Sequence, residues 1–193
     1  MEPPAAWDGQ KSAQTASYLI PTQSLATEPR SPRRRLLPLL ACLLAACGGS
    51  DPKALTDAGS AALNSGDAKA AISSFDRALA GMTAQDPSFL RASIGRCQAL
   101  ARIDPARAQA DFLELARAQP ERVREPEFVA VASELAARGS IGPATAVAEE
   151  GMKRYPESPA MTALRDRIGD AAKQADDPES LKKLKGLGYA GDG

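Results

Sequence analysis

Residues 52–186 alternate between short stretches rich in alanine, leucine, arginine and glutamate and single prolines that punctuate them. Proline suits the first position of a helix, where its missing N–H would have no partner in any case. Most of these prolines follow an aspartate or a serine, whose side chains accept a hydrogen bond from the free N–H groups of a first turn. The pattern predicts helices at 52–64, 67–80, 87–101, 105–118, 126–138, 143–154, 159–174 and 178–185.

The same region has no segment in which β-branched and polar residues alternate, as they do in a half-buried strand. The expected fold class is therefore all-α. The segments are short and separated by turn residues such as Gly66 and Gly139, so consecutive helices should pair as hairpins.

Small and aromatic residues recur along the second of these helices and the one before it. Ala71, Phe75 and Ala78 follow the Gly66-Asp67 turn, and Gly59 precedes it. This spacing resembles the tetratricopeptide repeat, a pair of helices with small residues where the helices meet and an aromatic residue on the second helix. The resemblance extends over two further copies, carried by Gly95, Ala108, Phe112 and Pro120, and by Ala132, Gly139, Ala144, Gly151 and Pro156.

The resemblance implies an antiparallel helix-hairpin solenoid of about three degenerate repeats, with a capping helix at 159–174. A repeat pair buries only one face against its neighbour, so about three repeats and a cap are needed to close a core. The largest core residues should be Phe75, Phe89, Phe112 and Phe128. A generic bundle of alanine-rich helices is the alternative, because such helices show chance periodicity.

A basic and apolar stretch, Arg33 to Cys47, precedes the helical region. Three arginines lead into an apolar run that ends in Leu-Ala-Ala-Cys, and the run is shorter than the roughly 20 residues that span a bilayer. The stretch resembles a bacterial lipoprotein signal. The expected organisation is a disordered leader or mis-called start (1–32), a signal peptide (33–46), a tether (47–51), a repeat domain (52–175), and a short helix with a flexible tail (176–193).

The lipoprotein resemblance implies that a lipid is attached to the thiol of Cys47 and anchors the chain in a membrane. Gly48 after that cysteine implies a protein of the cell envelope, sorted to the outer membrane and facing the periplasm if the cell has two membranes. Cys42 is a second, weaker match with a shorter apolar run before it. Two other interpretations remain open, namely a twin-arginine export signal and a core helix with basic flanks.

The amino-acid composition argues against several classes of function. The chain carries 24 basic and 24 acidic residues, and this neutral balance argues against a nucleic-acid partner, which needs a basic face. There is no histidine, which excludes histidine-based catalysis, and Cys97 is expected to be a small core residue. No phosphate loop, calcium loop or zinc motif is present. We expect no enzyme, no cofactor, no metal and no small-molecule substrate.

The remaining expectation is protein binding. In the repeat family ligands lie along the first helix of each pair, and on this chain the candidate peptide-binding residues are Asn64, Arg96, Ser60, Phe89 and Ser133. The partner would be an unknown protein or peptide, bound by the concave face. The alternative is a structural subunit of an envelope or secretion assembly, which docks by its convex face and its C-terminal tail. The tail itself is expected to be frayed, unless Leu187 and Tyr189 dock in the groove.

Overall fold

The computed structural model describes residues 51–191, which contain helices and no strands. The expectations for residues 1–50, including the signal peptide and Cys47, lie outside this range. The all-α fold class is confirmed for the described residues. The helices are α1 (Pro52–Asn64), α2 (Ala68–Ala80), α3 (Phe89–Leu100), α4 (Pro105–Ala118), α5 (Glu125–Ala137), α6 (Ile141–Arg154), α7 (Pro159–Gln174) and α8 (Pro178–Gly186).

The predicted helix starts are confirmed where an aspartate or serine caps the first turn. The side chains of Asp51, Asp67, Asp104, Ser158 and Asp177 each accept a hydrogen bond from a backbone N–H two or three residues later. Such a bond satisfies one of the N–H groups that the helix itself leaves without a partner.

The start predicted at Pro87 is wrong, because α3 begins at Phe89. The carboxylate of Asp86 does not cap a helix and instead accepts hydrogen bonds from the backbone N–H and the hydroxyl of Thr83. These bonds close a turn within residues 81–88, which form the α2–α3 loop.

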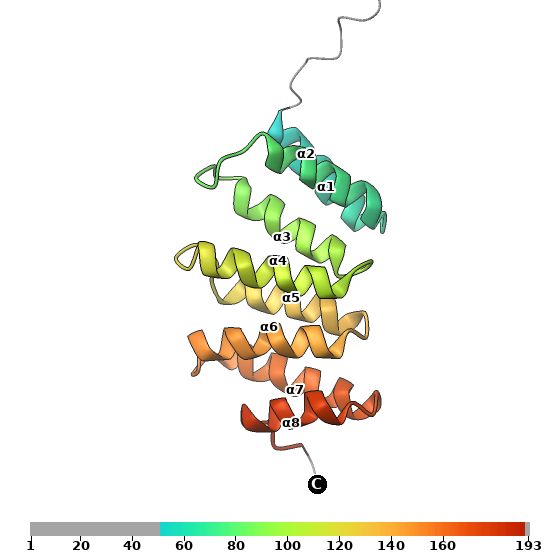
Figure 1. The fold of residues 1–193 in the computed structure, drawn as a ribbon, viewed down its shortest axis with the longest axis vertical. Coiled ribbons are helices and arrows are strands. Elements are labelled where there is room, and N and C mark those ends of the chain that lie inside the picture. The colour runs from blue at the N-terminus through green and yellow to red at the C-terminus, as the bar shows by residue number, and fades with distance from the viewer. Residues whose placement is uncertain (1–50, 192–193) are drawn as a thin grey trace, which may run out of the picture. The chain divides into compact units, whose positions relative to one another are not determined.

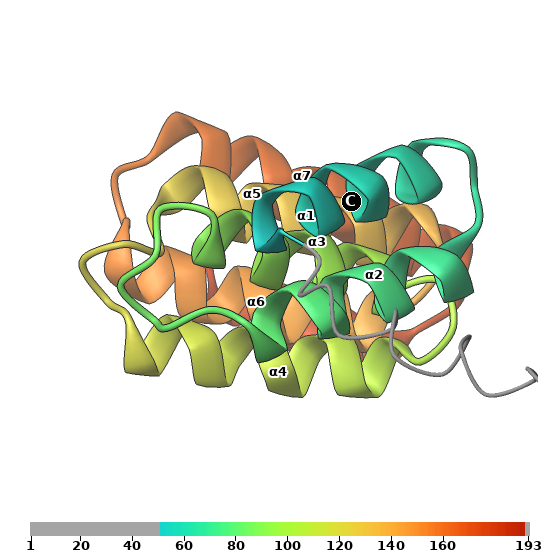
Figure 2. The ribbon, with the colours of Figure 1, turned by 90° about the horizontal axis from the view of Figure 1, so that it is seen from above.

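Two layers of helices make up the described residues. In the first layer α1 packs on α3, α3 on α5 and α5 on α7, and in the second α4 packs on α6 and α6 on α8. Each odd-numbered helix also packs on the even-numbered helix that follows it. Figure 2 shows α1, α5 and α7 on one side of the helix stack and α4 and α6 on the other.

Each odd-numbered helix forms a hairpin with the helix that follows it, and three of these four hairpins have the same turn geometry. Gly66, Gly139 and Asp176 have φ values of 89°, 74° and 52°, so each lies in the left-handed region just beyond the end of a helix. The next residue donates its N–H to a carbonyl in the last turn of that helix, at 2.9 to 3.0 Å. This is the Schellman arrangement, which satisfies helix-terminal carbonyls and reverses the chain.

The core contains the small and aromatic residues singled out by the spacing. Ala71, Ala108 and Ala144 are fully buried, as are Phe75, Phe112 and Phe128. The rings of Phe112 and Phe128 meet edge to face, with centroids 5.1 Å apart. Phe89 was also expected in the core and is not, because it is only half-buried at the start of α3, beside the α2–α3 loop.

The C-terminal residues pack on α7, so the expectation of a frayed end is wrong as far as Gly191. Tyr189 is buried, and its hydroxyl donates to Asp170 at 2.9 Å. Its ring lies against Gly169, where a side chain would collide with it, and Lys173 lies over the ring at 5.4 Å. The short helix predicted at 178–185 is present as α8, and it packs on α6 and α7 as part of the helical domain rather than beyond a boundary at residue 175 (Figure 1).

Candidate functional site

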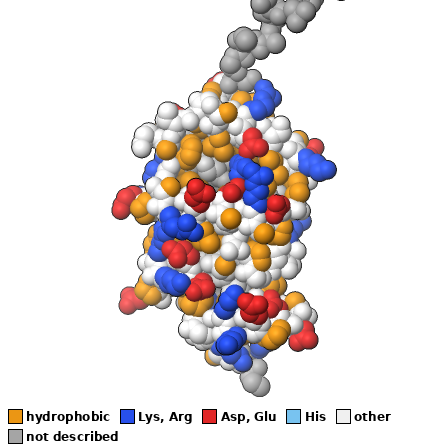
Figure 3. Space-filling view, in the orientation of Figure 1, with side chains coloured by type: hydrophobic (Ala, Val, Ile, Leu, Met, Phe, Trp, Pro, Cys, Tyr) orange, Lys and Arg blue, Asp and Glu red, His pale blue; other side chains and the backbone are white. Residues whose placement is uncertain are grey.

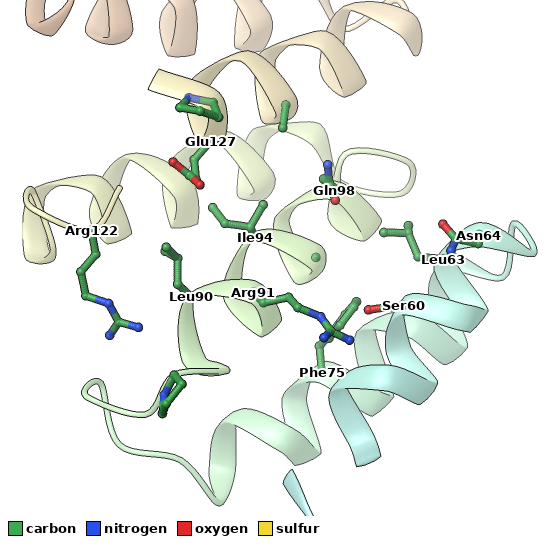
Figure 4. Close-up of a pocket in the computed structure, with 14 residues that line it drawn as sticks. Ser60, Leu63, Asn64, Phe75, Leu90, Arg91, Ile94, Gln98, Arg122 and Glu127 are labelled. Atoms are coloured by element: carbon green, nitrogen blue, oxygen red, sulfur yellow. The ribbon is translucent and has the colours of Figure 1, made fainter. Parts of the chain in front are cut away.

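An open groove runs across the first layer of helices. It has a volume of about 570 Å³ and is bounded by α1, α3 and α5, the end of the α2–α3 loop, and the α4–α5 loop (residues 119–124). Figure 4 shows its labelled side chains, with those of α1 on one wall and α3 along the bottom. The lining residues are Ser60, Leu63, Asn64, Phe75, Pro87, Leu90, Arg91, Ile94, Gly95, Gln98, Arg122, Pro126, Glu127 and Ala130.

The bottom of the groove is apolar. Leu90 and Ile94 are four residues apart on α3, so they lie on the same face of the helix, one turn apart. Leu63 of α1 also lines the groove, and Figure 4 shows it next to Asn64 and near Gln98. Both α3 side chains are half-buried. Apolar side chains that stay accessible in a concave surface are typical of a binding site.

Two primary amides lie beside this apolar surface. Asn64 comes from the end of α1 and Gln98 from α3, and among the described residues neither side chain has a hydrogen-bond partner. Ser60 is different, because its hydroxyl donates to the Thr56 carbonyl at 2.9 Å. Each amide carries both a donor and an acceptor, which matches the backbone of a peptide.

The charged side chains around the groove already have partners. Arg91 reaches from α3 to Asp57 of α1, and the hydrogen bond from Arg91, followed by that from Lys53, lowers the pKa of the Asp57 carboxyl. Glu127 accepts the backbone N–H of Arg124 at 2.8 Å and so caps α5.

Arg122 is held in the same way by backbone carbonyls. Its guanidinium donates to the carbonyls of Ala84 and Asp86, the second at 3.1 Å, and this ties the α2–α3 loop to the α4–α5 loop. The groove is thus an apolar surface with uncharged polar groups beside it rather than an open anion site.

The structure brings only two of the five predicted residues into this groove, Ser60 and Asn64. Arg96 and Phe89 lie on the other side of α3, where they line a separate pocket, and Ser133 lines a small cavity between α5 and α7. The guanidinium of Arg96 bridges Asp76 of α2 and Asp111 of α4. Burial opposes the charge of Arg96, but the hydrogen bonds to the two carboxylates outweigh it, and the pKa of Arg96 is raised. These ion pairs join α2, α3 and α4.

The rotation of α3 about its own axis explains why Phe89 and Arg96 lie away from the groove. Gly95 faces the ring of Phe75 on α2. This contact directs Arg96 toward the second layer and directs Ile94 and Gln98 toward the groove. The groove residues Leu90, Ile94 and Gln98 were missed. Their regular four-residue spacing is the signal that could have found them.

The described residues contain no group of three or more side chains suited to hold a metal ion. Burial raises the pKa of the Cys97 thiol to about 12, so it is protonated at neutral pH and a poor nucleophile. Among the described helices, none combines the length and the apolar character that crossing a membrane requires.

Comparison of this chain with protein-family models, curated proteins and solved structures found no match.

Proposed function

We propose that this chain is a membrane-anchored, extracytoplasmic lipoprotein whose tetratricopeptide-like repeats bind a protein or peptide partner in the groove of α1, α3 and α5. The observation that carries the proposal is the set of apolar side chains that line the groove, Leu63, Leu90 and Ile94, together with the amides of Asn64 and Gln98, which have no hydrogen-bond partner among the described residues. A concave surface of this chemistry suits a peptide with apolar side chains and a hydrogen-bonding backbone.

Contacts between positions about one repeat apart support the repeat interpretation. Arg102 donates to the Leu63 carbonyl at the end of α1, and Arg154 donates to the Ala116 carbonyl at the end of α4. The two residues of each pair are 39 and 38 positions apart, close to the spacing of about 36 that the buried alanines suggest. Each bond satisfies a helix-terminal carbonyl from the neighbouring helix pair.

The peptide-binding part of the proposal is tested with Asn64→Ala combined with Gln98→Ala. Both amides lack partners among the described residues, so the double variant should keep its helicity and melting temperature and lose recovery of the partner in cross-linked pull-downs from membranes.

Gln109→Ala combined with Gln174→Ala is the matched control. Gln109 is half-buried on a helix, as Gln98 is, and Gln174 is exposed at the end of a helix, as Asn64 is, but neither glutamine lines the groove. This control should recover the partner as the wild type does. If Asn64→Ala combined with Gln98→Ala recovers the partner as well as the wild type does, the peptide-binding proposal is contradicted.

The anchor rests on the resemblance at Arg33 to Cys47 and is tested separately. Cys47→Ser should move the protein from the membrane fraction to the soluble fraction, because stable anchoring takes two or more acyl chains. If Cys42→Ser releases the protein from the membrane fraction and Cys47→Ser does not, Cys42 is the lipidated residue. If both variants stay in the membrane fraction, the lipid-anchor proposal is contradicted.

The alternative, an assembly subunit that docks through its convex face and tail, has less support. Tyr189 of the tail already packs on α7, so little of its apolar surface is left for a partner. A truncation at residue 175 would also strip α8 from the core, so loss of the partner in that variant would not distinguish the two functions.

A further inference from the structure

A second pocket lies on the opposite side of α3 from the groove. In the second layer α4 packs on α6 and α6 on α8, but α2 makes no comparable contact with α4 among the described residues. Both helices pack on α3 instead, and Figure 1 shows α3 in view between α2 and α4. The space left between these helices is a pocket of about 440 Å³, within the range of small-ligand sites.

The walls of this pocket are largely apolar. Leu79 of α2, Leu115 and Ala118 of α4 and the half-buried ring of Phe89 all line it. In the same orientation as Figure 1, Figure 3 shows hydrophobic side chains exposed between the charged ones on this face. Phe89 is the one phenylalanine of the chain that is not fully buried, so its ring is available for an aromatic neighbour.

The pocket also contains an acceptor without a donor. The side-chain amide of Gln119 lines it, and its Oε1 is buried with no hydrogen-bond partner among the described residues. The Nε2 of the same amide faces the Ala84 carbonyl at 3.5 Å, a long contact that is consistent with this placement of the amide oxygen. Oε1 itself is shielded, so a ligand reaches it only when the last torsion of Gln119, which is broad in glutamine, turns Oε1 toward the pocket and gives up the long contact of Nε2 with Ala84. An unpaired buried acceptor is unfavourable, so a donor from a ligand would relieve it.

The arginines that line the pocket are already paired with carboxylates, so they do not favour a charged ligand. Arg96 is neutralised by Asp76 and Asp111, and Asp111 also pairs with Arg107 at 3.6 Å. Glu114 is exposed at the margin and adds a further acceptor rather than a donor. The pocket therefore favours an uncharged ligand that combines an apolar ring with a hydrogen-bond donor.

We propose that this pocket binds an aromatic ring carrying one N–H donor, the chemistry of an indole, with the ring beside Phe89 and the N–H directed at Gln119 Oε1. A free indole compound and the tryptophan side chain of a partner share this chemistry. The site is separate from the groove and does not depend on the proposed peptide binding.

The test titrates the full chain, labelled with ¹⁵N, with indole, 1-methylindole and N-acetyltryptophanamide. Indole should bind with a dissociation constant at or below about 1 mM, as expected for a small fragment that fills part of such a pocket. The N-methyl analogue has the same ring without the donor and should bind roughly tenfold more weakly. Shifts should centre on Ser93, Phe89 and Gln119. Binding of N-acetyltryptophanamide as well would assign the site to a partner's tryptophan, whereas binding of indole alone would assign it to a free compound.

Gln119→Met removes the acceptor and keeps the length of the side chain, so it should abolish the preference for indole over 1-methylindole. Gln98→Met, the same change in the groove, is the control and should leave that preference intact. Circular dichroism verifies that both variants fold. Equal affinity of the wild type for the two compounds, shifts centred on Ile94 and Gln98, or no binding of indole at several millimolar would each overturn the proposal.

Discussion

The ring of Phe75 on α2 occupies the space where a side chain at position 95 of α3 would lie. A methyl group on Gly95 would come within 2.5 Å of the Phe75 Cζ, and one on Gly59 of α1 within 2.7 Å of its Cε1. Phe75 is fully buried. One aromatic ring thus sits between two glycines on neighbouring helices of the first layer, and it is this contact that sets the rotation of α3.

Gly95→Ala should destabilise the protein. Overpacking a closely packed core costs typically about 1–3 kcal/mol, against a gain of roughly 0.5–1 kcal/mol from replacing a helical glycine. We expect a net loss of about 1–2 kcal/mol in urea unfolding. Gly142→Ala in α6 is the control, because a methyl group there meets nothing within 4 Å, and it should be neutral or stabilising. A Gly95→Ala variant as stable as the wild type would contradict the close packing of the Phe75 ring against Gly95.

Ala108→Arg should prevent the middle of the helix stack from folding, while Arg107→Ala should barely change it. Ala108 is fully buried, so an arginine there must overpack the core or bury an unpaired charge, at a cost of several kcal/mol. The side chain of Arg107 is 57% exposed and makes only a weak ion pair with Asp111. Thermal melts followed by circular dichroism compare the two, and similar melting temperatures would mean that position 108 is not in the core.

Asp176→Gly should stabilise the α7–α8 hairpin. Asp176 has φ 52° at the position that glycine occupies in the α1–α2 and α5–α6 turns, and this conformation is costly for a residue with a Cβ atom. We expect a gain of up to about 1 kcal/mol. The reverse exchange, Gly139→Asp, should lose a similar amount, since no atom lies near enough to collide with a side chain there. Equal stabilities in chemical denaturation would argue against backbone strain at residue 176.

Tyr189→Ala should weaken the C-terminal end of the stack. The change removes a buried ring from the surface of α7 and should cost about 2–4 kcal/mol, with faster proteolysis after α7. Tyr189→Phe keeps the ring and loses only the hydrogen bond to Asp170, so it should cost about 0.5–1.5 kcal/mol. Gly169→Ala, which pushes a methyl group to 2.4 Å from the Tyr189 Cε2, should resemble the alanine variant. Wild-type proteolysis of all three would show that the tail is not docked.

The pH dependence of stability should carry a contribution from Cys97. Burial raises the pKa of its thiol from 9.0 to about 12, so the unfolded chain releases the proton first. Its contribution is fully present below pH 9 and is lost as the pH rises from 9 toward 12, by roughly 1 kcal/mol per pH unit. Cys97→Ala should flatten this part of the curve relative to the wild type. Parallel curves for the two proteins would show that the thiol is accessible to water.

The order and approximate bounds of the helices were accessible from the sequence, because the signals that start and end a helix act over a few residues. Asp104 caps its own helix four residues before the buried Ala108, and both features can be read without knowing the fold. The exception at Asp86 shows the limit of such signals, since an Asp-Pro pair also makes a turn when the hydroxyl of Thr83 is within reach.

Contacts between helices decide which residues line the groove. Each residue along a helix turns the side chain by about 100°, so a small error in rotation moves a predicted binding residue to another face. Ser60 and Asn64 of α1 line the groove, whereas on α3 the contact between Phe75 and Gly95 directs Gln98 to the groove and Arg96 to Asp76 and Asp111.

The sequence by itself thus determined the all-α class, the hairpin turns and the buried alanines, because local propensity and capping specify them. Only the tertiary structure decided the rotation of α3, the pocket beneath the α2–α3 loop and the docking of Tyr189 on Gly169. Each of these joins residues from different helices, and packing in three dimensions, rather than spacing along the chain, selects such pairs.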